Sequence, residues 1–538
     1  MIRVRLLRVV VRKAIPRSAR QAIYRVLPEG ARRRVRQPSP TEIERQAAPI
    51  DPDASPFRVR TANLDRVVAA LDAAAVPYFR LPAAGPGHTA VGVPESFREQ
   101  IEGAFPGAVL VAVPADPVKP GPPAAPPATE PVATAVYWPV TDPGRRLLLG
   151  VEHACHVEFW RELPDRLSAP RYNLAVDDVM RTDDEVEAAE SAFGDFRPAE
   201  PGQRRYKTRR SLLTPPLDHV DFPIDVVYTW VDGADPAWLA RKNAAMTENG
   251  WVTANEQAAN NSRYVSRDEL RYSLRSLHAH APWVRRIFLV TDDQVPAWLN
   301  TGHPQITVVS HKEIFGGKGK LPTFNSHAIE TRLHHIEGLA EHFIYTNDDV
   351  FFGQPLEPGF FFTGAGHTRV YLSKHRVDCG PPTVDEPPVM SAGKNNRLLI
   401  EREFGRFLAF KIKHTPHAAR RSVLAEIEER CAAEVAATAS HQFRHPGDIS
   451  MLSSLQQHWS YASGRAVFGD VQYMYRDLSD PLTPKRLATA LRKRHHQLFC
   501  LNDTNADQAS AEIQAELLAS FLPAYFPFRS PYELPGVA

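Results

Sequence analysis

The stretch Phe343-Ile-Tyr-Thr-Asn-Asp-Asp-Val-Phe-Phe-Gly353 decides the predicted fold. Its first four residues are strand formers, and Asn347, Asp348 and Asp349 follow directly. Open α/β sheets bind ligands at the carboxyl ends of their strands. Adjacent carboxylates repel each other unless a cation neutralises them, and Mg²⁺ is often held by one or two carboxylates plus substrate phosphates. We therefore expect Asp348 and Asp349 to hold Mg²⁺ or Mn²⁺ on a nucleotide. The alternative is an ordinary strand-end turn.

The chain before this stretch repeats the pattern of a strand followed by acids. Residues 224–230, 286–291 and 305–310 are rich in β-branched and aromatic side chains, and the first two segments lead to Asp232 and Asp292. Segments between them have the apolar spacing of helices. This alternation predicts an α/β fold with a mostly parallel sheet whose carboxyl edge carries several acids.

A helix is expected after the first of these strands. Ser266 and Glu269 fit a capping box, and leucines recur behind them at core spacing. Arg271 and Arg275 form a basic stripe beside that apolar face. Such a stripe can bind phosphate oxygens, although arginines in this position are more often solvated or paired with acids.

The segment between residues 311 and 342 offers two further motifs. Residues 316–320 are rich in glycine and lysine, but no Lys-Ser/Thr pair opens a helix after them, so we expect a flexible lid and not a Walker loop. His327, Glu330 and His334 share one face of the next predicted helix. Because their spacing is not that of a zincin and no fourth ligand is evident, we interpret them as a polar face and keep Glu330 as a candidate.

Composition predicts several domains and no general affinity for nucleic acid. The chain has 538 residues, 43% of them hydrophobic, and a net charge of +2. Its four cysteines are far apart and fit no disulfide framework, which favours a reducing cytoplasm. The expected divisions are a basic N-terminal segment (1–45), a small α/β accessory region (46–203) with a Pro-rich linker (114–131), a catalytic domain (204–510), and a C-terminal helix and tail (511–538). Residues 57–110 are expected to form a helix, two strands, a second helix and a third strand, and residues 204–210 are expected to be a hinge.

The N-terminal segment is strongly basic. Residues 1–37 contain many arginines and the single acid Glu29, and the arginines interrupt every apolar run that could span a bilayer. A basic amphipathic segment can contact an anionic membrane surface, which would place the protein at the inner face of the plasma membrane. The alternatives are a solvated basic arm or a targeting segment.

Four segments, taken in order, resemble the characteristic blocks of the Stealth family of hexose-1-phosphate transferases. The likeness covers residues 224–503. The segments are Ile224-Asp-Val-Val-Tyr-Thr-Trp-Val-Asp-Gly-Ala-Asp-Pro236, Asp268-Glu-Leu-Arg-Tyr-Ser-Leu-Arg-Ser276 with its continuation to Trp298, Leu321-Pro-Thr-Phe-Asn-Ser-His-Ala-Ile-Glu330 through Asp349, and Phe499-Cys-Leu-Asn-Asp503.

The resemblance implies a GT-A-like sheet. The sequence of residues 389–475 predicts a helical insertion, with residues 400–412 and 418–437 as its clearest helical stretches. The resemblance also implies transfer of a hexose 1-phosphate from a UDP-sugar to a hydroxyl of an oligo- or polysaccharide, with release of UMP, in capsular or cell-wall polysaccharide synthesis. Two rivals stay open: a metal-dependent glycosyltransferase that releases UDP, and a non-catalytic glycan-binding protein. The implied catalytic set is His417, Arg444, Asp232 and Glu269; the implied substrate-binding set is Arg271, Arg275, Asn347, Asn502 and Asp503.

These residue types suit the implied chemistry. The reaction must neutralise a crowded diphosphate and align the attacking and leaving oxygens. Asp348 and Asp349 would hold the divalent metal, and Arg444 would stabilise charge on the transferred phosphoryl group. His417 is the expected general base for the acceptor hydroxyl, with a turn histidine as the alternative. Asp232 would contact the donor.

Overall fold

The computed structural model describes residues 39–82, 85–101, 103–114, 131–171, 173, 175–199, 202, 204–250, 264–503 and 508–536. The chain divides into two compact units, Met1–Pro49 and Ile50–Ala538. In the first, Ser39 and Glu42 form a capping box at helix α4 (Pro40–Ala47). The expected membrane contact of residues 1–37 lies outside the described residues. None of the described helices is both long and apolar enough to cross a membrane.

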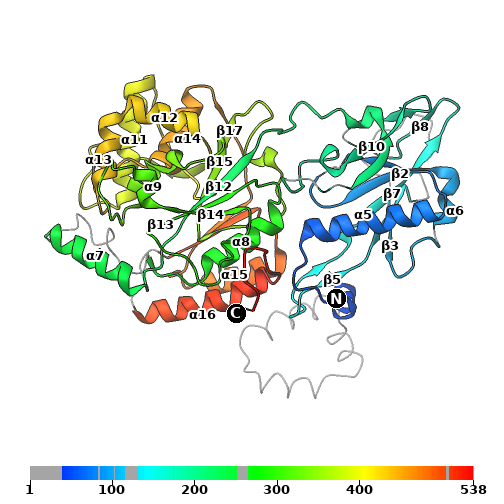
Figure 1. Ribbon diagram of the computed structural model, residues 1–538, viewed down its shortest axis with the longest axis horizontal. Coiled ribbons are helices and arrows are strands. Elements are labelled where there is room, and N and C mark those ends of the chain that lie inside the picture. The colour runs from blue at the N-terminus through cyan, green and yellow to red at the C-terminus, as the bar shows by residue number, and fades with distance from the viewer. Residues whose placement is uncertain are drawn as a thin grey trace, which may run out of the picture. The chain divides into compact units, whose positions relative to one another are not determined.

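A five-stranded sheet organises the second unit (Figure 1). Its strands lie in the order β14 (Ile306–Ser310), β13 (Ile287–Thr291), β12 (Ile224–Thr229), β15 (His342–Asn347) and β20 (His417–Arg420). The first four are parallel, and β20 runs antiparallel to β15. The predicted mixed α/β fold with a mostly parallel sheet is therefore confirmed, and the three strands predicted around Asp232 and Asp292 lie side by side in it.

Both faces of this sheet are buried, which explains its unbroken apolar strands. On one face, Val226 and Tyr228 pack with the leucines of α8 (Glu269–His280). On the other, Val227 and Tyr345 pack with a larger cluster. That cluster draws on α9 (His311–Phe315), α11 (Pro388–Phe404), α12 (Arg421–Arg430), α13 (Ala432–Ser440) and α14 (Gln456–Ala462).

A second sheet continues from the decisive stretch. Strand β16 (Val350–Phe352) pairs with β23 (Leu498–Asn502), which pairs with β22 (Tyr473–Asp477). Phe351 and Phe499 pack with helices α15 (Thr483–Lys493) and α16 (Gln508–Tyr525). The C-terminal helix and tail, which we expected to be separate from the catalytic domain, therefore belong to its core.

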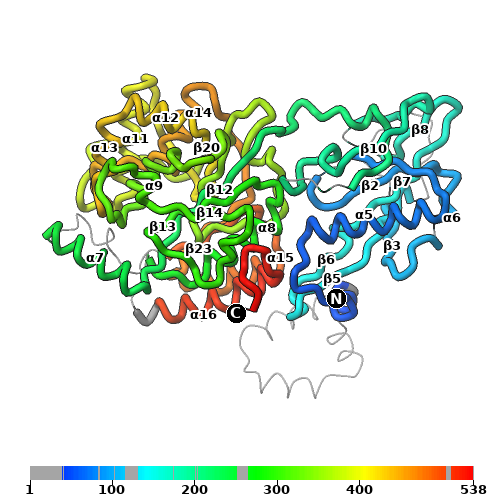
Figure 2. The backbone as a smooth tube through the Cα atoms, viewed as in Figure 1, coloured from blue at the N-terminus to red at the C-terminus, as the bar shows by residue number. Residues whose placement is uncertain are grey.

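The accessory region has helices and a sheet of its own, in the blue and cyan part of the tube (Figure 2). The order predicted for residues 57–110 is found as α5 (Pro56–Ala73), β1 (Phe79–Leu81), β2 (Thr89–Pro94), α6 (Arg98–Ile101) and β3 (Val109–Val113). These strands join β4 (Ala133–Tyr137), β7 (Cys155–Glu162), β8 (Arg166–Ser168) and β9 (Asp178–Met180) in a seven-stranded sheet. Residues 205–209, expected as a hinge, instead form β11 and pair with β10 (Glu185–Ala189).

Two local expectations were wrong. Helix α8 begins at Glu269, and Asp268 precedes it in a left-handed conformation without a side-chain cap, so Ser266 forms no capping box. Of the helix predicted over 400–412, only residues 400–404 are helical, as the end of α11, because Gly405 terminates that helix and residues 410–412 form a strand. The remaining elements are α7 (Pro236–Glu248), α10 (Ser326–Glu330), β5 (Val140–Thr141), β6 (Leu148–Leu149), β17 (Thr368–Val370), β18 (Leu372–Arg376), β19 (Phe410–Ile412), β21 (Ala466–Phe468) and the π-helical turn η9 (Met451–Leu455).

Candidate active site

Three carboxylates converge where β15 ends and α8 begins. Asp348 and Asp349 occupy the turn between β15 and β16, and Glu269 is the first residue of α8. Burial, reinforced by the charges of Glu269 and Asp349, raises the pKa of Asp348 well above its usual value. Burial likewise raises the pKa of Glu269 to about 7, and the charge of Asp349 adds to this shift. The cluster therefore carries more negative charge than its surroundings neutralise.

Arg267 links this cluster to the end of the second sheet. Its backbone N–H donates to Glu269, and its guanidinium donates to Asp503 Oδ2 at 2.9 Å, although it stays 3.8 Å from the Glu269 carboxylate. The other carboxylate oxygen of Asp503 is buried and makes no hydrogen bond to any described residue. Asn502 and Asn347 end β23 and β15, so the structure brings both predicted substrate-binding asparagines to the strand ends that border the cluster.

Asp349 has two neighbours that the sequence did not single out. The Cys500 thiol donates to its Oδ2 at 3.3 Å, and His414 Nε2 lies 3.6 Å from its Oδ1. The Tyr473 hydroxyl donates to the His414 carbonyl at 2.6 Å and fixes that loop. Cys500 lies within the quoted Phe499-Cys-Leu-Asn-Asp503 segment, and His414 opens the His414-Thr-Pro-His417 run that ends in the expected base. Their position within these motifs is the sequence signal that could have identified Cys500 and His414.

The two histidines of that run have opposite environments. His417 lies on β20 opposite Tyr345, and burial, helped by the charge of His414, lowers its pKa to about 3. Burial also disfavours the charged form of His414, but Asp349 and Glu330 outweigh it and raise the pKa of His414 above the usual value. Of the two rings, His414 lies against an acid of the cluster, whereas His417 packs against Tyr345.

Arg444 is held in a rigid loop. Its guanidinium donates to Ser326 Oγ at 2.8 Å, and its charge acts on both His414 and Tyr345. The buried Asp448 organises the loop by accepting hydrogen bonds from Asn325 and His441 and from the backbone of residue 445. The structure thus brings Arg444 to the same side of the sheet edge as His414.

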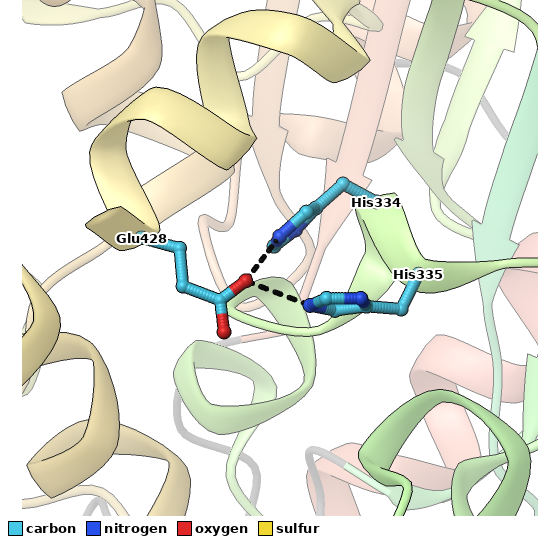
Figure 3. A group of neighbouring side chains, drawn as sticks. All are labelled: His334, His335 and Glu428. Carbon is cyan, nitrogen blue, oxygen red and sulfur yellow. Dashed lines mark hydrogen bonds and ion pairs between the residues drawn. The ribbon is translucent and has the colours of Figure 1, made fainter.

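The expected polar face of His327, Glu330 and His334 does not exist, because all three side chains are buried. Helix α10 ends at Glu330, whose carboxylate accepts hydrogen bonds from the backbone N–H groups of residues 452 and 453 at the start of η9. His334 instead lies beside His335, and both aim Nε2 at one oxygen of Glu428, at 2.6 and 2.7 Å (Figure 3). Arg332 holds the other oxygen.

Arg271 and Arg275 do not extend toward the cluster. Both donate to the buried carboxylate of Glu533 in the C-terminal tail, Arg271 at 2.7 Å and Arg275 at 2.8 and 2.7 Å. This ion-pair network ties α8 to the tail. We therefore withdraw the substrate-binding role expected for these two arginines in favour of the acid-paired alternative.

The other strand-end acids are engaged by nearby protein groups. Asp232 accepts a hydrogen bond from the backbone of Ala234, and its own backbone is fixed by Gln294. Asp292 binds Arg241, and Asp293 binds Lys312 at 2.5 Å. Asp232 follows the carboxyl end of β12, and its expected contact with the donor stays a proposal.

The cluster fits a divalent cation. Three carboxylates approach one another, two of them with raised pKa values, and Asp349 Oδ1 is buried without a hydrogen bond to any described residue. Hard oxygen ligands of this kind suit Mg²⁺ or Mn²⁺. A bound cation would remove the electrostatic penalty that the raised pKa values express. The residues that would hold it are Asp348 and Asp349, with Glu269 and Asp503 beside them.

Comparison with known proteins agrees with the order of these segments. Stealth protein conserved regions 1, 2, 3 and 4 match residues 222–250, 263–370, 413–461 and 489–537. The third region is thus the segment of His414 and Arg444, whereas we had assigned the third block to residues 321–349. The fourth region includes the tail that carries Glu533, beyond the limit of residue 503 that we expected.

Two curated relatives come from Streptomyces coelicolor. The exopolysaccharide phosphotransferase SCO6023 is 42% identical over 90% of this chain and 84% of its own length. The exopolysaccharide phosphotransferase SCO2594 is 43% identical over 90% of this chain and 86% of its own length. Among solved structures, a galactosyltransferase LgtC complex with donor and acceptor sugar analogues aligns with 55% of this chain and 96% of its own at 12% identity, with a TM-score of 0.29. The chain is a transferase enzyme that belongs to the Stealth family.

Proposed function

We propose that this enzyme transfers an N-acetylhexosamine 1-phosphate from a UDP-sugar to a hydroxyl of a polysaccharide in capsular or cell-wall polysaccharide synthesis. The products are a phosphodiester and UMP. The observation that carries the proposal is the buried, under-neutralised cluster of Glu269, Asp348 and Asp349 beside His414 and Arg444. The names of the two Streptomyces relatives support the same class of reaction.

In this proposal, each group has a defined task. A divalent metal at Asp348 and Asp349 would neutralise the diphosphate of the donor. The acceptor oxygen forms a bond to the β-phosphorus, the bond from that phosphorus to the bridging oxygen breaks, and UMP leaves with the electron pair. His414 takes the proton of the acceptor hydroxyl, and Arg444 stabilises the charge of the transferred phosphoryl group.

Cys500 and Tyr473 keep His414 in place for this task. Tyr473 holds the backbone of residue 414, and Cys500 occupies the second oxygen of Asp349. The His414 ring is thereby left facing Asp349 Oδ1. Asp349 and Glu330 raise the pKa of His414, whereas burial lowers the pKa of His417 to about 3 and makes it a poor proton acceptor, which favours His414 as the base.

The test is incubation of the purified protein with UDP-N-acetylglucosamine, Mg²⁺ and a panel of bacterial oligosaccharides, with UMP and UDP resolved chromatographically. Metal- and acceptor-dependent UMP release, with a phosphodiester in the product, supports the proposal. UDP release would identify a glycosyltransferase. If neither nucleotide is released with any of the common UDP-sugars, the donor class in this proposal is wrong.

A further inference from the structure

The second sheet has two different faces. Phe351, Met474 and Phe499 point from one face into the core formed with α15 and α16. Side chains alternate along a strand, so Tyr473 and Tyr475 of β22 point from the opposite face. Cys500 belongs to this face too, because it pairs in register with Tyr475. Since the Cys500 thiol donates to Asp349, this face forms one wall of the acid cluster.

The two tyrosines of this wall differ in exposure. Tyr473 is half-buried, and its hydroxyl is engaged by the backbone of His414. Tyr475 is 39% exposed. Burial of part of its ring, followed by the charges of Cys500 and Asp349, raises the pKa of the Tyr475 phenol, which places this side chain within electrostatic reach of the cluster. A large aromatic side chain is therefore open to solvent beside the reacting groups.

We propose that Tyr475 is a stacking platform for a sugar ring of the acceptor saccharide. Aromatic faces are favoured in ligand sites because they bury a large apolar area at a small entropic cost, and one face of a pyranose ring is lined by C–H groups. The donor diphosphate occupies the acids, whereas a polymeric acceptor must approach from solvent, where Tyr475 lies. Asn502, two residues beyond Cys500 on the same face, is placed to hydrogen-bond sugar hydroxyls.

This inference deepens the proposed function and can be separated from it. Labelled wild-type protein with UDP and Mg²⁺ is applied to a printed array of bacterial oligosaccharides. Tyr475→Ala should lower the signal on the bound glycans about tenfold, and Tyr475→Phe should retain it. The matched control is Tyr461→Ala, because Tyr461 is 42% exposed but stacks on Phe468, with ring centroids 3.9 Å apart. If Tyr475→Ala bound the glycans as strongly as the wild type, or if the wild type bound none, the proposed stacking role of Tyr475 would be overturned.

Turnover gives the second readout. With the strongest-binding glycan as acceptor, Tyr475→Ala should raise the acceptor KM about tenfold and leave the donor KM unchanged, while Tyr461→Ala changes neither. A loss in kcat at unchanged acceptor KM contradicts the stacking role. If all variants release UDP, the proposed phosphotransfer fails, but the array and the acceptor KM still decide whether Tyr475 binds the saccharide.

Discussion

Two buried glutamates meet helix α8 in opposite electrostatic settings. Glu533 accepts hydrogen bonds from Arg275 and Arg271, which outweigh its burial and lower its pKa to about 2. Glu269 lies among other carboxylates, and its burial raises its pKa to about 7. Two glutamates beside the same helix are thus treated differently: arginines of α8 neutralise Glu533, whereas Glu269 is left for a ligand. A buried acid without enough positive charge indicates function, whereas a paired one indicates architecture.

The largest expected effect comes from removing one acid of the cluster. Asp349→Asn should lower metal-dependent transfer by about a thousandfold, about 4 kcal/mol of activation free energy, because the divalent cation loses a charged ligand. Initial rates of nucleotide release measure the change. The matched control is Asp293→Asn, since Asp293 is also a strand-end acid but pairs with Lys312 at the surface. A similar loss in both variants would remove the distinction between the two kinds of acid.

Breaking the neutralised site should affect stability. Glu533→Gln leaves two buried guanidinium groups without their carboxylate, so we expect the free energy of unfolding to fall by about 4 kcal/mol. Urea denaturation at neutral pH measures it. Asp53→Asn, at the exposed Arg529 pair, should change it by less than about 1 kcal/mol.

Lowering the pH should remove the stabilisation that Glu533 provides. Because the pKa of Glu533 in the folded protein is below its usual value of 4.5, its contribution to stability is present above about pH 4.5 and is lost as the pH falls toward about 2. A Glu533→Gln variant that is as stable as the wild type at pH 7 would show that the tail does not anchor α8.

The pH dependence of stability that arises from Glu269 should have the opposite sign. The folded pKa of Glu269 is raised from 4.5 to about 7, so in metal-free protein its favourable contribution is present below about pH 4.5 and disappears as the pH rises through about 7. The shift in the pKa of Glu269 corresponds to about 3 kcal/mol in the free energy of unfolding. Glu269→Gln should therefore raise metal-free stability at pH 8, and Mg²⁺ should stabilise the wild type more than this variant. Destabilisation by Glu269→Gln in chelator would contradict the account.

The smallest effect concerns the two histidines. His414→Gln should reduce kcat about a hundredfold with little change in donor KM, because proton removal from the acceptor is lost. His417→Gln should cost only a few-fold, since its ring packs against Tyr345 and has no contact with the acids. Steady-state kinetics of both variants show which histidine acts as the general base. The reverse ranking would restore His417 as the base.

The sheet and its acids were predictable because they follow from short patterns. Strands that end in acids fixed the positions of Asp348 and Asp349, and apolar spacing identified the buried face of α8. Both signals come from neighbouring residues, and the sheet topology confirms the strands.

The misjudged residues depend on contacts between distant segments. Arg271 pairs with Glu533, 262 positions away, and Glu330 caps η9, 122 positions away. The choice between His414 and His417 depends on which ring faces Asp349, and the spacing of the motif does not determine this. Local sequence therefore predicted where the acids gather, and tertiary contacts decide which charged groups remain for substrate.

The most direct test of the account is Mn²⁺ binding, followed by the electron paramagnetic resonance signal of the free ion. We predict that the wild type binds Mn²⁺ in competition with Mg²⁺, that Asp349→Asn abolishes this binding, and that Asp293→Asn preserves it. If Asp349→Asn bound Mn²⁺ as tightly as the wild type, the carboxylates at the end of β15 would not be the metal site, and the central claim would be refuted.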